Sequence, residues 1–216
     1  MYLHILSNRT NMIDLYTYNT FNGQQISIAL EEMNLEYNVH KIDLFAGEQR
    51  SDSFLKINPS GRIPAIIDRQ CGDNKSLSLS QTMAILIYLA DKSGQFIANN
   101  AADRAKTIEW LCFQSADIST NIFNSFLLQS LIKPPQAETA QILRQRAKKF
   151  YQVFDQQLAK TKYLVDDNYS IADMSSFAVV HSIHTELPMD EYKNLNRWHQ
   201  SISKRPAVIR GLSIPL

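Results

Sequence analysis

Hydrophobic and polar positions follow two different periods along the chain, and the change of period divides it into two parts. In the first part, short β-prone runs alternate with segments whose apolar residues recur at helical spacing. The β-prone runs cover residues 12–16, 38–43, 65–68 and 76–79, and the helical runs cover residues 24–33 and 82–92. This order predicts a β-α-β unit followed by a β-β-α unit.

The two helices predicted in this part have recognisable faces and ends. The helix over residues 24–33 has one apolar face, and its acidic residues Glu31 and Glu32 face away from it. We therefore expect the helix to pack on a sheet. The helix over residues 82–92 is followed by Gly94, which suits the left-handed conformation that closes many helices.

After residue 100 the strand pattern fades, and long segments carry apolar residues at a period of about 3.6. These segments are residues 104–114, 137–160 and 171–183. Pro134 and Pro135 interrupt the pattern and predict a loop, because proline lacks a backbone donor and restricts the residue before it. Ser170 and Asp173 have the spacing of a capping box, which predicts the start of a buried helix.

These patterns predict an α/β domain followed by an all-α domain. We place the first domain at residues 12–94 and the helical domain at residues 101–216. Residues 1–11 form an N-terminal extension, which we expect to pack against a sheet edge or a partner.

Composition and charge exclude several classes of protein. Twenty-two basic and twenty-one acidic residues give a net charge of +1, so we expect no nucleic-acid partner. No apolar run approaches the roughly 18 residues of a membrane span, and the first ten residues are too polar for a secretory leader. We therefore expect a cytoplasmic protein with no membrane partner. Cys71 and Cys112 form no CxxC pair, so we expect free thiols, with Cys112 buried among apolar neighbours.

Two histidines of the helical part have a spacing that metal sites also use. His181 and His184 are one helical turn apart, and Glu186 is nearby. We interpret them as cleft or surface residues and expect no metal.

Three segments of the first domain could carry chemistry, and the first is residues 16–23. It joins the first predicted strand to the first helix and brings hydroxyl and amide groups to a helix N-terminus. Such a place can lower the pKa of a thiol from its reference value of about 8.5. An ordinary capped turn is the alternative interpretation.

The second segment, residues 58–65, is a turn with a proline at the start of a β-prone run. A cis peptide bond before Pro64 would leave the N–H and C=O of Ile63 free to pair with an extended peptide. The alternative is a rigid turn without a ligand.

The third segment, residues 79–85, leads from a strand into a helix and places the Thr82 hydroxyl beside unpaired N–H groups, which suits a carboxylate. Capping of the helix by Ser80 is the alternative. Together the three segments predict a thiol site, a peptide-pairing edge and an anion site.

In this order, the segments IDLYTYNTFNGQQISIALEE, NPSGRIPAI, LSLSQTMAILIYLADKSG, YSIADM and KRPAVI resemble the glutathione transferase superfamily. They are most similar to its bacterial Nu class, the GSH-dependent disulfide-bond oxidoreductases. The resemblance implies a thioredoxin-like first domain, a helical-bundle second domain and a homodimer. It also implies glutathione as co-substrate, with a small disulfide or another electrophile as second substrate.

The resemblance also assigns the group that stabilises the glutathione sulfur. It places Thr20 and Asn22 near the sulfur, and no protein cysteine takes part. Tyr18 is the rival, since it lies five residues before Gly23, the spacing found in tyrosine-type members.

The remaining glutathione contacts follow from the same resemblance. It implies that Gln49 and Arg62 contact the tripeptide and that Ile63 pairs with its cysteinyl backbone. Gln81 and Thr82 hold the γ-glutamyl end.

Some residues depart from the Nu-class pattern. Gln81 and Thr82 replace its Glu-Ser pair, and Asn19 stands where proline is common. Residues 115–124 lack the usual glycines and contain Phe123, which predicts a reshaped second-substrate pocket. These departures leave open a catalytically silent, glutathione-binding protein with the same fold.

Overall fold

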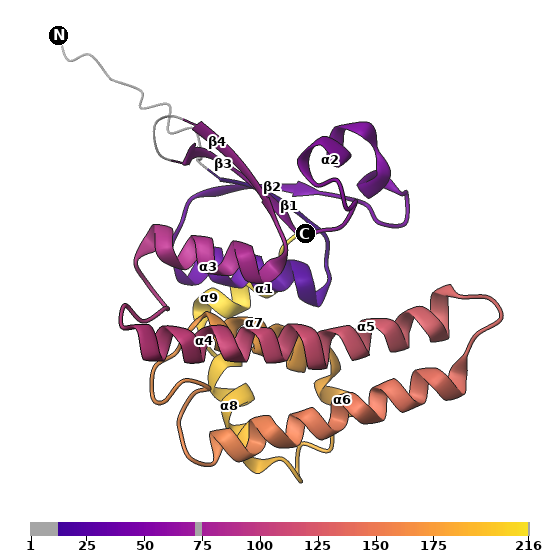
Figure 1. Cartoon of the computed structure of the whole chain (residues 1–216), viewed down its shortest axis with the longest axis vertical. Helices are drawn as coiled ribbons and strands as arrows, with labels where there is room; N and C mark the ends of the chain where they lie inside the picture. The colour runs from indigo at the N-terminus through magenta and orange to yellow at the C-terminus, as the bar shows by residue number, and fades with distance from the viewer. Residues whose placement is uncertain (1–12, 72–74, 216) are drawn as a thin grey trace.

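The computed structural model describes residues 13–71 and 75–215. The expected N-terminal extension and Met12 lie outside the described residues. The packing that we expect for the extension therefore stays a prediction. The chain forms two consecutive domains. The first is a sheet with its helices, and the second is a helical bundle (Figure 1).

The first domain is built on a four-stranded mixed sheet with strand order β2-β1-β3-β4. Its elements are β1 (Ile13–Thr17), α1 (Phe21–Glu32), β2 (Tyr37–Lys41), η1 (Glu48–Arg50), α2 (Asp52–Ile57), β3 (Ala65–Cys71), β4 (Lys75–Ser80) and α3 (Thr82–Ser93). Strand β1 pairs parallel with β2 and antiparallel with β3, which pairs antiparallel with β4. The predicted order of strands and helices is confirmed, and η1 and α2 are additions to it.

The second domain is helical. Its elements are α4 (Ala101–Phe113), η2 (Gln114–Ser119), α5 (Thr120–Phe126), η3 (Leu127–Leu131), α6 (Ala137–Leu158), α7 (Ile171–Ile183), η4 (His184–Glu186), α8 (Lys193–Ser203) and α9 (Pro206–Leu212). The segments η2 and η3 are π-helical, so α4 and α5 continue as one rod, and α6 returns beside it (Figure 1). Among the described residues, no helix combines the length and the apolar character that crossing a bilayer requires.

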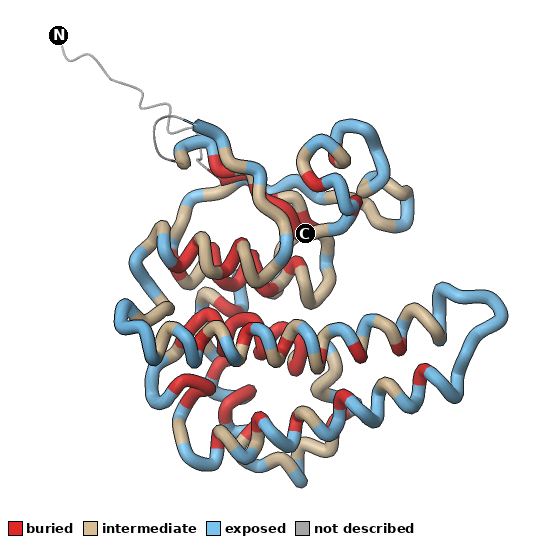
Figure 2. The backbone as a smooth tube through the Cα atoms, viewed as in Figure 1, coloured by how far each residue is buried: buried red, intermediate tan, exposed pale blue. Residues whose placement is uncertain are grey.

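The core is continuous across the two domains. Helix α7 is its centre, since every residue from Ile171 to Val180 is buried. Helix α1 packs against α3, α7 and α9 (Figure 2). A Cβ on Gly211 of α9 would lie 2.6 Å from the Ile28 Cα, so only glycine permits this approach of α9 to α1.

The two acidic residues at the end of α1 form ion pairs with α9 and the residue before it, and Glu31 also accepts a hydrogen bond from Tyr37 of β2 at 2.8 Å. Arg205 donates two hydrogen bonds to the Glu32 carboxylate at 2.6 and 2.8 Å, and Arg210 pairs with Glu31. Glu32 is almost fully buried, so these residues join the two domains and do not form a solvated face.

Local end signals of the helices are confirmed, and one burial prediction is wrong. Gly94 closes α3 with φ of 67°, and Ser170 and Asp173 form the capping box of α7. Cys112 is exposed, because the buried face of α4 runs through Thr107 and Leu111 and the next residue points outward.

Asp68 is a buried carboxylate that ties β3 to α3. Lys92 Nζ lies 2.7 Å from it, the Tyr88 hydroxyl donates to it at 2.6 Å, and the Gln70 N–H donates at 2.9 Å. Burial raises the pKa of Asp68, but these hydrogen bonds and the charge of Lys92 outweigh it and leave the pKa below the ordinary 3.8.

The Asp68 ion pair predicts a pH-dependent stability. Because the folded pKa is lowered, the contribution is complete above about pH 4 and is lost as the pH falls through the folded pKa. We expect Asp68→Asn to lower the free energy of unfolding by about 2 kcal/mol at neutral pH. The variant should also lose less stability than the native protein as the pH falls below about 4. Urea unfolding at a series of acidic and neutral pH values measures both effects. The exposed Asp91 of the Arg104 pair is the control, and an equal effect of Asp91→Asn would contradict the prediction.

Candidate active site

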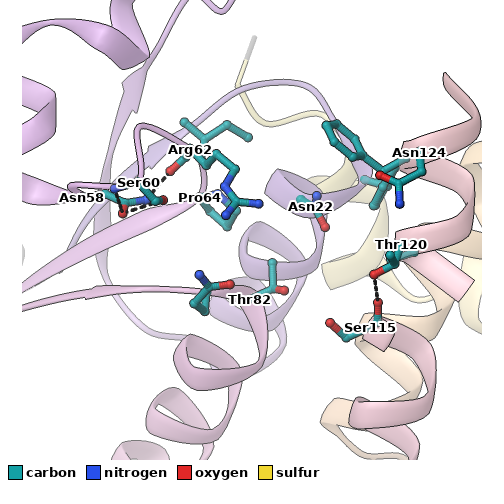
Figure 3. Close-up of a pocket in the computed structure, with 14 residues that line it drawn as sticks. Asn22, Asn58, Ser60, Arg62, Pro64, Thr82, Ser115, Thr120 and Asn124 are labelled. Carbon is teal, nitrogen blue, oxygen red and sulfur yellow. Dashed lines mark hydrogen bonds between the residues drawn. The ribbon is translucent and has the colours of Figure 1, made fainter. Parts of the chain in front are cut away.

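A cleft of about 310 Å³ lies between the two domains (Figure 3). Its lining comes from the first turn of α1, the turn before β3, the start of α3, and the segments η2 and α5. The lining residues are Phe21, Asn22, Asn58, Ser60, Arg62, Ile63, Pro64, Gln81, Thr82, Ser115, Ser119, Thr120, Phe123 and Asn124. Six of the predicted site residues are among them: Asn22, Arg62, Ile63, Pro64, Gln81 and Thr82.

The N-terminus of α1 supplies polar groups from the first predicted segment. Thr20 is the N-cap, and its hydroxyl oxygen accepts a hydrogen bond from the Gly23 N–H at 3.2 Å, which leaves the hydroxyl proton available to a ligand. The Asn22 side-chain oxygen accepts from Gln25 Nε2 at 3.2 Å, so its amide group keeps its donors for the cleft. A Cβ on Gly23 would lie 2.3 Å from the Tyr18 carbonyl oxygen, which explains a glycine here.

Tyr18 and Thr20 lie outside the lining of the cleft, although they precede Asn22 closely in sequence. The Tyr18 ring packs edge-on against Phe45, with ring centres 6.1 Å apart. Of the three residues predicted to contact the glutathione sulfur, Asn22 is the one that lines the cleft. The roles of Thr20 and Tyr18 stay predictions.

The turn before β3 is held by Asn58, a buried residue to which the sequence pattern assigned no role. Its side-chain nitrogen donates to the Arg62 carbonyl, and its oxygen accepts from the N–H and hydroxyl of Ser60 at 3.1 and 2.9 Å. The Ile63–Pro64 peptide bond is cis, as expected. Within the described part of the chain, neither the N–H nor the C=O of Ile63 makes a hydrogen bond, so both are available at the cleft.

Gln49 lies on η1 beside this turn and not on the cleft wall. Its side-chain nitrogen lies 3.4 Å from the Leu44 carbonyl oxygen, and its buried Oε1 has no partner among the described residues. Gly61 has φ of 60°, and a Cβ there would lie 3.0 Å from the Gln49 carbonyl oxygen. The Gln49 backbone therefore lies against the turn at Gly61, and its contact with a ligand stays a prediction.

The start of α3 offers free backbone donors. Gln81 is the N-cap with φ of 74° and makes no side-chain capping bond, so the alternative interpretation, in which Ser80 caps the helix, is wrong. The first-turn N–H groups and the helix dipole therefore face the cleft next to Thr82, and both favour an anion. Among the described residues that line the cleft, Arg62 carries the only charge, and it is positive.

The opposite wall is polar and comes from the π-helical turn η2 and from α5. Ser115, Thr120 and Asn124 face the cleft (Figure 3), and the Thr120 hydroxyl donates to the Ser115 carbonyl at 2.9 Å. Phe123 lines the same wall and is 44% exposed. The predicted place of Phe123 near the cleft is confirmed. The π-helical segment η2, a feature frequent at functional sites, was not predicted from the sequence.

A buried polar network connects the two walls. The Ser175 hydroxyl of α7 lies 2.7 Å from Gln25 Oε1 and 2.9 Å from Gln114 Oε1. Gln25 donates to Asn22, and Gln114 donates to Ser119. Because the three central side chains are buried, the network holds residues of both walls in fixed orientations.

Comparisons with known proteins match both domains. The family model of the glutathione S-transferase N-terminal domain matches residues 13–91, and that of the C-terminal domain matches residues 117–210. The disulfide-bond oxidoreductase YfcG of Escherichia coli is 36% identical over 208 residues, which cover 93% of this chain and 94% of that protein.

Solved structures are similar over almost the whole chain. A glutathione transferase family member from Pseudomonas fluorescens, with two glutathione molecules bound, has a TM-score of 0.89 and 32% identity, and the match covers 97% of this chain and 96% of that one. A glutathione transferase from Pseudomonas putida, with one glutathione disulfide bound per subunit, has a TM-score of 0.88 and 29% identity, and the match covers 98% and 95%.

Proposed function

The chain belongs to the glutathione S-transferase family, and from this premise we propose that it is a glutathione-dependent enzyme that reduces disulfides with the thiolate of bound glutathione. The observation that carries the proposal is the convergence of three kinds of group in one cleft. These are the unpaired backbone of Ile63, the uncapped N-terminus of α3 and the side-chain amide of Asn22.

The proposed binding mode uses each of these groups once. The cysteinyl backbone of glutathione pairs with the N–H and C=O of Ile63, as an added strand would. The γ-glutamyl carboxylate lies at the N-terminus of α3 beside Gln81 and Thr82. Arg62 offsets the negative charge of the tripeptide, and the sulfur lies beside Asn22, within reach of the Thr20 hydroxyl.

The proposed reaction needs two glutathione molecules. The first thiolate attacks one sulfur of the disulfide, the S–S bond breaks, and the other sulfur leaves as a thiolate that takes up a proton. A second glutathione thiolate then attacks the resulting mixed disulfide, which releases the second thiol and glutathione disulfide. The two electrons come from the two glutathione thiols. Neither Cys71 nor Cys112 lines the cleft, so the protein supplies no sulfur of its own.

Calorimetry with reduced and oxidised glutathione, together with a disulfide-reductase assay on a small disulfide, tests the proposal. We expect both forms of glutathione to bind and the disulfide to be turned over. Turnover of an electrophile panel without disulfide reduction would shift the assignment to conjugation. Binding without any turnover would support the silent protein, and absence of binding would refute the proposal.

We also propose a homodimer. Several large apolar side chains are exposed, and most of them lie on or near the α5–α6 hairpin, which projects from the body of the molecule (Figure 2). Phe45, on the loop after β2, is 92% exposed, and Leu131 and Ile142 are also exposed. Exposed apolar side chains that gather on one element, as on this hairpin, mark protein interfaces.

Light scattering tests the dimer. We expect a particle of twice the chain mass at micromolar concentration, because the exposed apolar side chains would be covered in it. Phe45→Asp is expected to shift the equilibrium to the monomer, since it would bury a charge in the interface. A monomeric native protein would contradict the predicted dimer. A dimer unaffected by Phe45→Asp would contradict the predicted place of Phe45 in its interface.

The cytoplasm is the location that we propose. The reaction consumes reduced glutathione, which the cytosol maintains, and the structure has free thiols at Cys71 and Cys112. Cell fractionation measures the location directly.

A further inference from the structure

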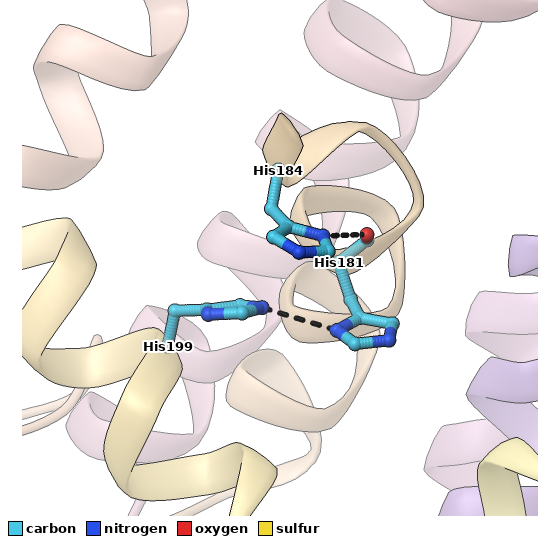
Figure 4. A group of neighbouring side chains, drawn as sticks. All are labelled: His181, His184 and His199. Carbon is cyan, nitrogen blue, oxygen red and sulfur yellow. Dashed lines mark hydrogen bonds between the residues drawn. The ribbon is translucent and has the colours of Figure 1, made fainter. Parts of the chain in front are cut away.

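Three histidines converge on one side of the helical domain, away from the cleft. His181 lies in the last turn of α7, His184 begins η4, and His199 reaches them from α8 (Figure 4). One ring nitrogen from each histidine lies within 4.8 Å of those of the other two. The sequence pattern indicated His181 and His184, and the fold adds His199 from a separate helix.

The hydrogen bond of His184 prepares its ring for metal binding. Its Nδ1 lies 2.6 Å from the His181 carbonyl oxygen. A carbonyl oxygen can only accept, so Nδ1 carries the proton and Nε2 keeps its lone pair. Metal-binding histidines usually have this arrangement, in which the second ring nitrogen donates to a carbonyl or carboxylate.

The other two histidines lie close together and share a hydrogen bond that a metal ion would replace. His181 Nδ1 and His199 Nε2 are 3.1 Å apart, so one of these two nitrogens carries the proton of this bond. Two nitrogen ligands at about 2.1 Å from a tetrahedral zinc ion are separated by about 3.4 Å. Rotation of the side chains, with His184 on a short 3-10 turn, can bring all three nitrogens to such a distance.

An apolar residue lies against the rings of His199 and His181. The Phe177 ring stacks on both rings, with ring centres 5.2 and 5.3 Å away, and forms an apolar floor. His181 and His184 are only partly buried, so an ion has access from solvent.

We propose that His181, His184 and His199 form a binding site for a divalent transition-metal ion, with Zn²⁺ as the ion that fits this set of ligands. Three neutral imidazoles suit Zn²⁺, whereas Mg²⁺ and Ca²⁺ prefer oxygen ligands. Glu186 pairs with Arg144 at 2.9 Å, so water and not this carboxylate would supply the remaining ligand. This proposal departs from the expectation, drawn from the sequence, of a protein without metal.

The ion would fasten the end of α7 to α8. The ligands come from two helices and the turn between them, so a bound ion would resist their separation. The proposal is independent of glutathione chemistry, since none of the three histidines lines the cleft.

The test uses the full chain without an affinity tag, after treatment with a chelator. We expect calorimetry to give one Zn²⁺ per chain, Mg²⁺ to give no heat, and Zn²⁺ to raise the melting temperature. Co²⁺ should give a tetrahedral visible spectrum without a sulfur charge-transfer band, which excludes Cys71 and Cys112 as ligands. We expect His184→Gln and His199→Asn each to weaken Zn²⁺ binding by at least about tenfold.

His40→Asn is the matched control, since His40 pairs with Asp14 in the first domain. It should leave Zn²⁺ affinity unchanged. No Zn²⁺ binding by the native chain, or binding that His184→Gln and His199→Asn do not weaken, would overturn the proposal. If those variants fail to fold, the imidazole NMR signals of the native chain provide the test. Zn²⁺ should shift the signals of His181, His184 and His199 and leave the signal of His40 unchanged.

Discussion

Asn22→Ala is expected to lower kcat/KM for disulfide reduction by about threefold to thirtyfold at neutral pH. The reason is the loss of the amide donor that we propose for the glutathione thiolate at the N-terminus of α1, where Asn22 lines the cleft. A thiol with its reference pKa of about 8.5 is only about 3% thiolate at pH 7, and once the pKa exceeds the pH each further unit costs close to a factor of ten in thiolate. The pH dependence of kcat/KM measures this directly, since its midpoint should move to higher pH in the variant.

Controls separate the three residues proposed for the sulfur. Tyr18→Phe should leave activity unchanged, because the Tyr18 ring lies outside the cleft lining and packs on Phe45. Thr20→Ala removes a helix cap as well as a hydroxyl and costs about 1 kcal/mol of stability, so Thr20→Ser is the matched variant. Unchanged activity in Asn22→Ala with a large loss in Tyr18→Phe would transfer the role to the tyrosine.

Gln25 gives a second test of the same site. It holds the Asn22 oxygen and is itself held by Ser175, so it positions the amide without touching the ligand. We expect Gln25→Met, which keeps the volume and removes both hydrogen bonds, to move the pH midpoint in the same direction as Asn22→Ala but less. A loss of stability with an unmoved midpoint would assign Gln25 a purely structural role.

The parts of the fold that local chemistry determines could be predicted from the sequence. Period-two and period-3.6 patterns located the strands and the long helices, and the signals at Gly94 and at the Ser170 capping box marked helix ends. Two missed helices also carried local signals. Leu195, Trp198 and Ile202 have helical spacing in α8, and proline stands in the first turn of α9.

Other features depend on contacts between distant segments, and local patterns do not contain them. The π turn in the cleft wall and the link from Gln25 through Ser175 to Gln114 arise where the two domains meet. His199 joins the other histidines only because α8 packs near α7. The same reason explains the candidate site, where local motifs indicated one wall and the resemblance indicated Phe123 of the opposite wall, whereas the polar residues of that wall needed the structure.

The capping box of α7 shows how a local motif can acquire a long-range role. Besides the Ser170 N–H and hydroxyl, the Asp173 carboxylate accepts from the Leu164 N–H at 3.0 Å and from Trp198 Nε1 at 2.8 Å. Asp173 is fully buried, and it joins the start of α7 to the preceding loop and to α8. Its removal would leave donors of three segments without an acceptor.

We therefore expect Asp173→Ala to lower the free energy of unfolding by about 3 to 5 kcal/mol, a large share of the roughly 5 to 15 kcal/mol that is typical of a folded protein. Urea unfolding followed by circular dichroism measures the loss. Ser170→Ala removes only the local cap and should cost about 1 kcal/mol. Asp173→Asn keeps one oxygen acceptor and should lie between the two, and it remains measurable if Asp173→Ala does not fold. Equal losses in Ser170→Ala and in both Asp173 variants would mean that the bonds to Leu164 and Trp198 add nothing to the cap.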